Sequence, residues 1–195
     1  MLIEETRRPL SKALPNARLA VCTCALLAIM SQPLLAQQAP PSGDSFVTNL
    51  ASGGVSYADT NFGSEIALLV APAASSYVQF NLSAIPPGAT VGKAMLRLYV
   101  DLVTTGGSFD VYEVDNAWNE NTLTFNTQPL PLGPSATGSH PIALTSASRS
   151  QFLLIDITPL VQGWASGTIA NNGIALTSTN GTFAFAVRAL VAGMS

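Results

Sequence analysis

The sequence predicts an all-β protein, an antiparallel β-sandwich of jelly-roll type with one short helix near Pro159-Trp164. Short apolar segments, about eight to ten of them, follow one another with Gly, Pro and Asn turn signals between them, as in sandwich folds. Residues 93–102 alternate polar and apolar side chains, the pattern of a strand with one face in a core. Helix-start signals occur only at Thr158-Pro159.

Residues 1–36 are predicted to be a secretory signal peptide outside the folded domain. Four basic residues precede an apolar run over residues 19–30, and Ala36 offers a small residue for cleavage. An uncleaved anchor is the alternative, but the run is shorter than the ~20 apolar residues that span a bilayer. Arg7 and Arg8 also resemble a twin-arginine export signal. We expect a secreted chain, extracellular or periplasmic, with no membrane association after cleavage.

The composition after residue 36 restricts the chemistry of the chain. Both cysteines, Cys22 and Cys24, lie in the predicted signal, so no disulfide, thiol nucleophile or cysteine metal site is expected. Four basic and nine acidic residues remain, a net charge of −5. Nucleic-acid binding requires clustered Lys and Arg, so it is not expected here.

The predicted domain is a series of short strands. Residues 37–43 are predicted to be an exposed linker, and residues 93–102 and 109–114 to pair as a β-hairpin. The segment 115–134 is rich in Asn, Thr and Pro, but Trp118 in it indicates an ordered loop. Strands are predicted at residues 46–48, 66–70, 77–82, 93–102, 109–114, 140–145, 152–157, 174–176 and 182–187.

The predicted helix follows an apolar strand. Residues 152–157 are apolar except for one aspartate, which predicts a strand buried on both sides. Thr158 is expected to be the N-cap, followed by Pro159 at the first helical position. The helix should bury one face, which carries Leu160, Val161 and Trp164.

Several motifs follow one another in the order found in a known family. They are Asn61-Phe62-Gly63, the stretch 80–99, Trp118-Asn119-Glu120-Asn121-Thr122-Leu123-Thr124-Phe125-Asn126, Asp156-Ile157-Thr158 with Val161 and Trp164, and Asn172-Gly173. Together they resemble the DNRLRE domain family, also classed as carbohydrate-binding module family ninety-six. The resemblance covers residues 44–188. It implies a secreted β-sandwich that binds polysaccharide, and an alginate-binding role has been assigned within the family.

The chain departs from the family pattern mainly at its end. Residues 185–189 lack the Ser and Glu of the family, and the closing strand that normally follows is missing. We therefore expect residues 44–195 to form a DNRLRE-like sandwich with an unpaired edge strand, which invites self-association. A truncated product and an oligomer built on that edge are the two explanations. Asn81 and Phe125 are smaller departures, standing where the family has Asp and commonly Trp.

Catalytic and metal chemistry find little support. His140 is the only histidine, and nothing pairs it with a nucleophile. A glycosidase needs two carboxylates across a cleft, and the acidic residues between Asp110 and Glu120 are more typical of solvated surface. Residues 59–63 are similar to the opening of a calcium loop, but the later ligands are absent and a turn explains them. We expect no enzyme and no cofactor, with a structural calcium as the remaining alternative.

Sugar binding needs flat aromatic faces with polar groups around them. The candidate ligand-binding residues are Arg97, Tyr99, Trp118, Tyr57, Phe62 and Asn61. Arg97 and Tyr99 are the preferred surface, because they lie on the outer face of the most regularly alternating strand, residues 93–102. Trp164 is predicted to be a core residue, and Trp118 to pin its loop to the sandwich. With only four basic residues, a neutral glycan fits better than alginate.

Two functions remain. The first is a non-catalytic carbohydrate-binding module that recognises a polysaccharide. The second is a structural or adhesive module of a surface or matrix protein. A binding module should keep an exposed aromatic cluster, whereas a structural module should bury its aromatic residues.

Overall fold

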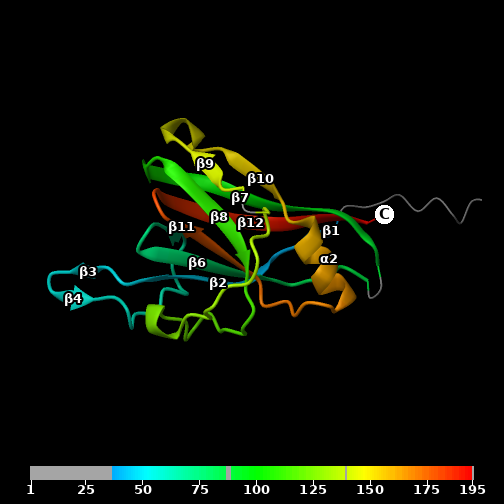
Figure 1. The fold of residues 1–195 in the computed structure, drawn as a ribbon, viewed down its shortest axis with the longest axis horizontal. Coiled ribbons are helices and arrows are strands. Elements are labelled where there is room, and N and C mark those ends of the chain that lie inside the picture. Colours follow the sequence, from blue (N-terminus) through cyan, green and yellow to red (C-terminus); the bar gives the residue numbers. More distant parts are fainter. Residues whose placement is uncertain (1–36, 87–88, 139, 195) are drawn as a thin grey trace, which may run out of the picture. The chain divides into compact units, whose positions relative to one another are not determined.

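The computed structural model describes residues 37–86, 89–138 and 140–194, without the side chains of residues 187–192 and 194. They form two antiparallel five-stranded sheets (Figure 1). Sheet A has the order β1-β12-β7-β10, with β5 also pairing with β12. Its strands are β1 (Gln37–Ala39), β5 (Leu68–Val70), β7 (Val91–Thr105), β10 (Phe152–Asp156) and β12 (Thr182–Met194).

Sheet B has the order β2-β6-β11-β8-β9. Its strands are β2 (Pro41–Thr48), β6 (Ala74–Phe80), β8 (Gly107–Glu113), β9 (Ile142–Leu144) and β11 (Ile174–Ser178). The shorter elements are the ribbon of β3 (Ala51–Ser52) and β4 (Val55–Ser56), the 3₁₀ turns η1 (Phe125–Thr127) and η2 (Ser146–Ser148), and helix α2 (Thr158–Ser166). The predicted all-β sandwich with one short helix is confirmed.

The main core lies between the two sheets. In β7, Leu96, Leu98 and Val100 are fully buried and alternate with half-buried residues, as their period of two predicted. They pack with Phe183 of β12 and Val111 of β8 in one apolar cluster. The apolar surface that leaves water here is the main force that holds the sheets together.

A second core lies on the outer face of sheet B. Tyr77 of β6 and Ala175 of β11 are fully buried, although they point away from the main core. The segment 115–134 covers them and contributes Leu123, which is 2 % exposed. This segment runs beneath β2 and β6 in Figure 1. The expectation of an ordered loop is confirmed.

The predicted hairpin of residues 93–102 and 109–114 is wrong. β7 pairs with β12 and β10 in sheet A, whereas β8 pairs with β11 and β9 in sheet B. Both strands bury their apolar side in the space between the sheets, so the chain crosses that space at Gly106-Gly107. Local alternation cannot distinguish such a crossing from a hairpin.

The predicted linker 37–43 is also wrong. Gln37–Ala39 is β1, which pairs with Leu190–Ala192 of β12, and β2 already begins at Pro41. Backbone pairing orders this polar stretch, with Ala39 buried beneath it. The signal predicted over residues 1–36 lies outside the described residues.

The end of the chain differs from the prediction too. β12 does not stop at Val187 but continues to Met194. It lies inside sheet A, with β7 on one side and β5 and β1 on the other. The last strand is therefore paired on both sides.

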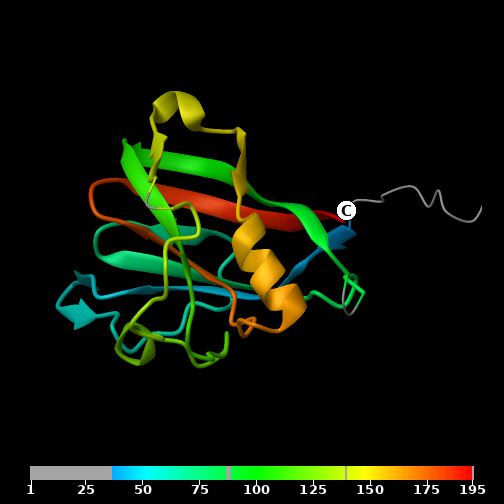
Figure 2. The same cartoon turned by 45° about the vertical axis from the view of Figure 1, so that its right-hand side comes forward.

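Helix α2 follows β10 at the end of the sheets opposite the β3–β4 ribbon, as Figures 1 and 2 show. It begins at Thr158 itself, so the prediction of Thr158 as N-cap is wrong by one residue. The Asp156 carboxylate accepts hydrogen bonds from the Thr158 amide and hydroxyl instead. The helix buries Leu160 and Trp164 as predicted. No helix in the described part of the chain is long and apolar enough to cross a membrane.

Candidate functional site

Three side chains form an open array on the outer face of sheet A. Tyr99 of β7 and Phe152 of β10 are register partners, and their ring centroids lie 5.0 Å apart. The guanidinium carbon of Arg97 lies 4.0 Å from the centroid of the Phe152 ring. Phe152 is 48 % exposed. Arg97, Tyr99 and Phe152 are called the aromatic–arginine array below.

Phe152 was missed by the sequence analysis. The apolar run of β10 predicted a strand buried on both sides, but β10 is the edge strand of sheet A. Only Ile155 in it is fully buried, while Leu154 is 63 % exposed. The pairing of Phe152 with Tyr99 brings the Phe152 ring to the outer face, and no local sequence pattern reveals that pairing.

Two short side chains of β12 lie opposite β7 beside the array. β12 presents Ala186 opposite Tyr99 and Ala184 opposite Leu102, and both alanines are half-buried. The face therefore offers rings and a cation to a flat or extended ligand.

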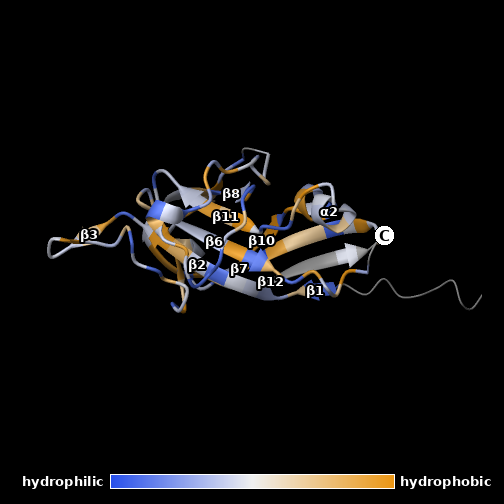
Figure 3. Cartoon of the chain, turned by 90° about the horizontal axis from the view of Figure 1, so that it is seen from below, coloured by the Kyte–Doolittle hydropathy of each residue, from blue (hydrophilic) through white to orange (hydrophobic). Residues whose placement is uncertain are grey.

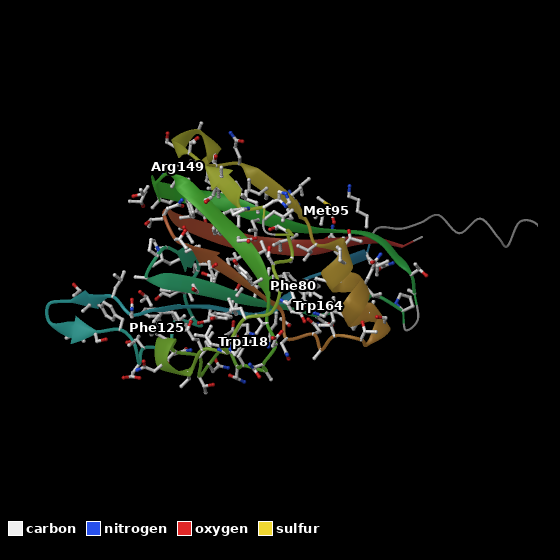
Figure 4. The ribbon with its side chains drawn as sticks, in the orientation of Figure 1. Phe80, Met95, Trp118, Phe125, Arg149 and Trp164 are labelled. Carbon is white, nitrogen blue, oxygen red and sulfur yellow. The ribbon has the colours of Figure 1, made fainter. Side chains whose placement is uncertain are left out.

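Every basic residue of the described chain lies in or beside sheet A. Lys93 and Arg97 are in β7, Arg188 is in β12, and Arg149 comes just before β10. The Arg149 Nε donates to the Asp101 carbonyl of β7, at 3.2 Å. Met95, an outer residue of β7, and Arg149 mark this side of the protein in Figure 4.

The acidic residues are distributed in the opposite way. Asp101 and Asp156 lie in sheet A. The hydrogen bonds from Thr158 hold the pKa of Asp156 below its usual range, with a smaller effect from nearby Lys93. The other seven acidic side chains of the described residues lie on sheet B or in the segments around it, namely Asp44, Asp59, Glu65, Asp110, Glu113, Asp115 and Glu120.

Tyr57, Asn61 and Phe62, three of the predicted binding residues, lie near sheet B instead. Phe62 stacks on Phe46 of β2, with ring centroids 4.3 Å apart, and Tyr57 meets its edge. Asn61 Nδ2 donates to the backbone oxygens of Glu120 and Leu123, at 2.6 and 2.8 Å. Asn61 therefore holds the segment 115–134 in place.

Trp118, the sixth candidate, also belongs to the sheet B side. Its ring meets Tyr77 edge-on at 5.8 Å, and its Nε1 donates to the Asn172 carbonyl at 2.9 Å. Figure 4 shows Trp118 and Phe125 on the far side from Met95 and Arg149. Trp118 thus pins its loop, as expected, and also lines a hollow of about 420 Å³.

The comparison with protein families agrees with this architecture. The model of carbohydrate-binding module family 96 matches residues 36–189. The chain belongs to this family. No curated protein matches the chain. The match spans both sheets, so the aromatic–arginine array and the Trp118 loop are both parts of the carbohydrate-binding module.

Asp110 is the most deeply buried carboxylate of the described residues. Asp110 is 7 % exposed, and its Oδ1 accepts from the Val111 amide and from the Ser135 and Thr137 hydroxyls. Burial, and secondarily Asp115, raise the pKa of Glu113. His140 is exposed, with its Nδ1 3.3 Å from the Thr137 carbonyl.

Side-chain oxygens of residues 59–63 are engaged in hydrogen bonds within the loops. Asp59 Oδ1 accepts from Asn126, and Asn61 Oδ1 accepts from the Gly63 amide. Within the described residues, no three His, Cys, Asp or Glu side chains come together. The oxygens singled out in the sequence thus serve the loop contacts.

Proposed function

We propose that this carbohydrate-binding module recognises an acidic polysaccharide across the outer face of sheet A. The observation that carries the proposal is the exposed aromatic–arginine array on the side of the module that holds its basic residues. Ligand sites combine apolar and aromatic surface with a few oriented polar groups. The array has this composition.

The geometry of β7 suits an extended polymer. Lys93, Met95, Arg97 and Tyr99 occupy successive outer positions of one strand. Residues two apart on a strand are separated by about 6.6–6.8 Å. Two cations and one ring are therefore spaced along one line, so that carboxylates and a sugar of one polymer can be contacted in turn.

The charge distribution changes the expected ligand. The number of basic residues, four in an acidic chain, favoured a neutral glycan. Their positions in the fold favour an acidic one. The fold places all four in or beside sheet A, whereas seven of the nine carboxylates lie on sheet B or in the segments around it. A guanidinium recognises a carboxylate by two parallel hydrogen bonds, so Arg97 suits a uronate. Opposed charges within about a Debye length, ~8 Å at physiological salt, attract such a polymer.

The predicted signal over residues 1–36 supports a role outside the cell or in the periplasm, where polysaccharides are found. The module requires no catalytic step for this role. Its proposed task is to hold a polymer.

The proposal is tested by calorimetric titration of the purified chain with alginate, polygalacturonate and neutral laminarin. Phe152→Ala and Arg97→Gln should each weaken binding of an acidic polymer about tenfold, which corresponds to ~1.4 kcal/mol. Leu130→Ala is the control, because Leu130 is similarly exposed, at 56 %, but lies in the segment 115–134.

Both Phe152→Ala and Arg97→Gln should keep the wild-type denaturation curve. Unchanged affinity in both would refute the proposed site. A folded chain that binds none of the three polymers would instead support the structural or adhesive module.

A further inference from the structure

We infer that the module has a second sugar site, for an uncharged saccharide, in the hollow beside Trp118. Trp118 lies on the opposite side of the sandwich from Met95 and Arg149, which mark the sheet A side (Figure 4). The hollow has a volume of about 420 Å³, and it is lined by Ala117, Trp118, Asn119, Thr122, Leu123 and Thr127. It goes beyond the proposed function, because neither its residues nor its ligand are shared with the array.

The indole of Trp118 is held rigidly. Its N–H is committed to the Asn172 carbonyl, and the Trp118 carbonyl accepts from Gln79 Nε2 at 3.3 Å. The Tyr77 ring supports it at 60°. A ring that is already ordered loses little conformational entropy when a ligand binds to it. Trp118 therefore pins the loop and lines the hollow at once.

Polar groups of the right kind surround this ring. Asn119 Oδ1 accepts from the Asn121 amide at 2.9 Å, which orients the Asn119 carboxamide. Thr127 Oγ1 is oriented by the Thr124 amide at 3.0 Å. The Thr122 hydroxyl has only a long contact, 3.5 Å, to the Asn119 carbonyl. Hydroxyl and amide groups around an aromatic ring match the hydroxyls and the apolar face of a sugar.

The electrostatics select an uncharged ligand. None of the six lining residues is charged. Asp115 and Glu120 flank the lining residues in sequence, and all the Lys and Arg of the described residues belong to sheet A or its margin. A uronate would be repelled on this side, because like charges disfavour binding. A neutral sugar meets no such repulsion.

Two sites on opposite sides would make one module a link between two polymers. A single extended chain that lies along β7 cannot also reach the Trp118 hollow, because the sandwich separates them. The module would then join an acidic polymer to a neutral one.

The test uses the side-chain N–H signals of the two tryptophans in an NMR titration. Trp164 is 6 % exposed and serves as the internal control. Laminarihexaose, cellohexaose and mannohexaose are added separately to ~10 mM, which nearly saturates a site with a Kd of ~1 mM. We expect at least one of them to shift the Trp118 signal and leave that of Trp164 in place.

Variants on the two faces make the test specific. Thr122→Leu fills the hollow and removes one exposed hydroxyl, so it should weaken neutral-sugar binding at least tenfold without affecting acidic polymers. Phe152→Ala should do the reverse. The inference is overturned if no hexaose moves the Trp118 signal, if Trp164 moves with it, or if Phe152→Ala abolishes the shift. Each result is independent of whether acidic polymers bind to sheet A.

Discussion

The two sheets of this module treat their outer faces differently. On sheet A, Tyr99 and Phe152 form an open surface with a cation above one ring. On sheet B, the segment 115–134 covers Tyr77 and builds a second apolar core. Both faces carry aromatic residues. Aromatic side chains therefore do not identify a binding face until it is known which face a loop covers.

A third apolar surface lies outside both faces. Leu50 and Val55 beside and within the β3–β4 ribbon are 48 % and 62 % exposed, and Figure 3 shows hydrophobic colour at this end of the protein. The outer faces of sheets A and B can be compared directly, because each is the outer side of a complete sheet. The same substitution made on both should have different effects.

The largest expected difference is between Leu123→Ala and Leu154→Ala. Leu123 is 2 % exposed in the second core, whereas Leu154 is 63 % exposed on the open face. Removing a buried leucine side chain costs about 2–5 kcal/mol through lost burial and a cavity. The exposed change should cost less than about 0.5 kcal/mol. Urea denaturation, followed by far-ultraviolet circular dichroism, measures both free energies of unfolding.

This pair tests whether the covering of sheet B is part of the fold. Equal and small effects of the two substitutions would mean that the segment 115–134 is only loosely attached. The comparison of a covered and an open face would then fail.

A smaller effect is expected from Asn61→Ala. The Asn61 amide bridges the Glu120 and Leu123 carbonyls, so its loss should cost about 1–3 kcal/mol. Affinity for acidic polymers should be unchanged, because this bridge lies on the sheet B side. Asn126→Ala, which removes an exposed contact to Asp59, is the control and should cost less. A loss of affinity for acidic polymers without a loss of stability would show that Asn61 is a binding residue.

The smallest effect concerns charge. Burial, and secondarily the Glu120 carboxylate, raise the pKa of Asp44. The folded state therefore holds this proton more tightly than the unfolded state, and the ionised form destabilises the fold above the raised pKa. Asp44→Asn should raise the free energy of unfolding at pH 7 by about 0.5 kcal/mol, a value reduced by solvent screening. The gain should disappear as the pH falls through the Asp44 pKa.

Asp156 on sheet A is the matched control with the opposite sign. Its pKa is lowered by the Thr158 hydrogen bonds, so its charge stabilises the fold above the unfolded pKa. Asp156→Asn should lower the denaturation midpoint at pH 7, and the loss should vanish as the pH falls through the lowered pKa. Midpoints measured between pH 3 and pH 7 distinguish the two cases. Shifts of the midpoint at pH 7 with the same sign for Asp44→Asn and Asp156→Asn would contradict this assignment.

Much of the fold could be predicted from local pattern. The alternation in β7 correctly predicted that Leu96, Leu98 and Val100 enter the main core, and Trp164 was placed correctly in the core. The alternation was wrong for Leu102, which is 41 % exposed. The site could be predicted only in part. Arg97 and Tyr99 share one surface as expected, but Phe152 was assigned to a buried strand. Asn61 and Trp118 were grouped with Arg97 and Tyr99, although they lie on the other side.

Most of the strands, the helix near Pro159 and the family follow from the sequence alone, because they depend on alternation, caps and short motifs. Long-range contacts place β7 and β8 in different sheets and make β10 an edge strand. They also cover the outer face of sheet B with the segment 115–134 and bring Lys93, Arg97 and Arg188 together in the strands of sheet A. These properties arise from pairing between segments far apart in the chain, which no local pattern encodes.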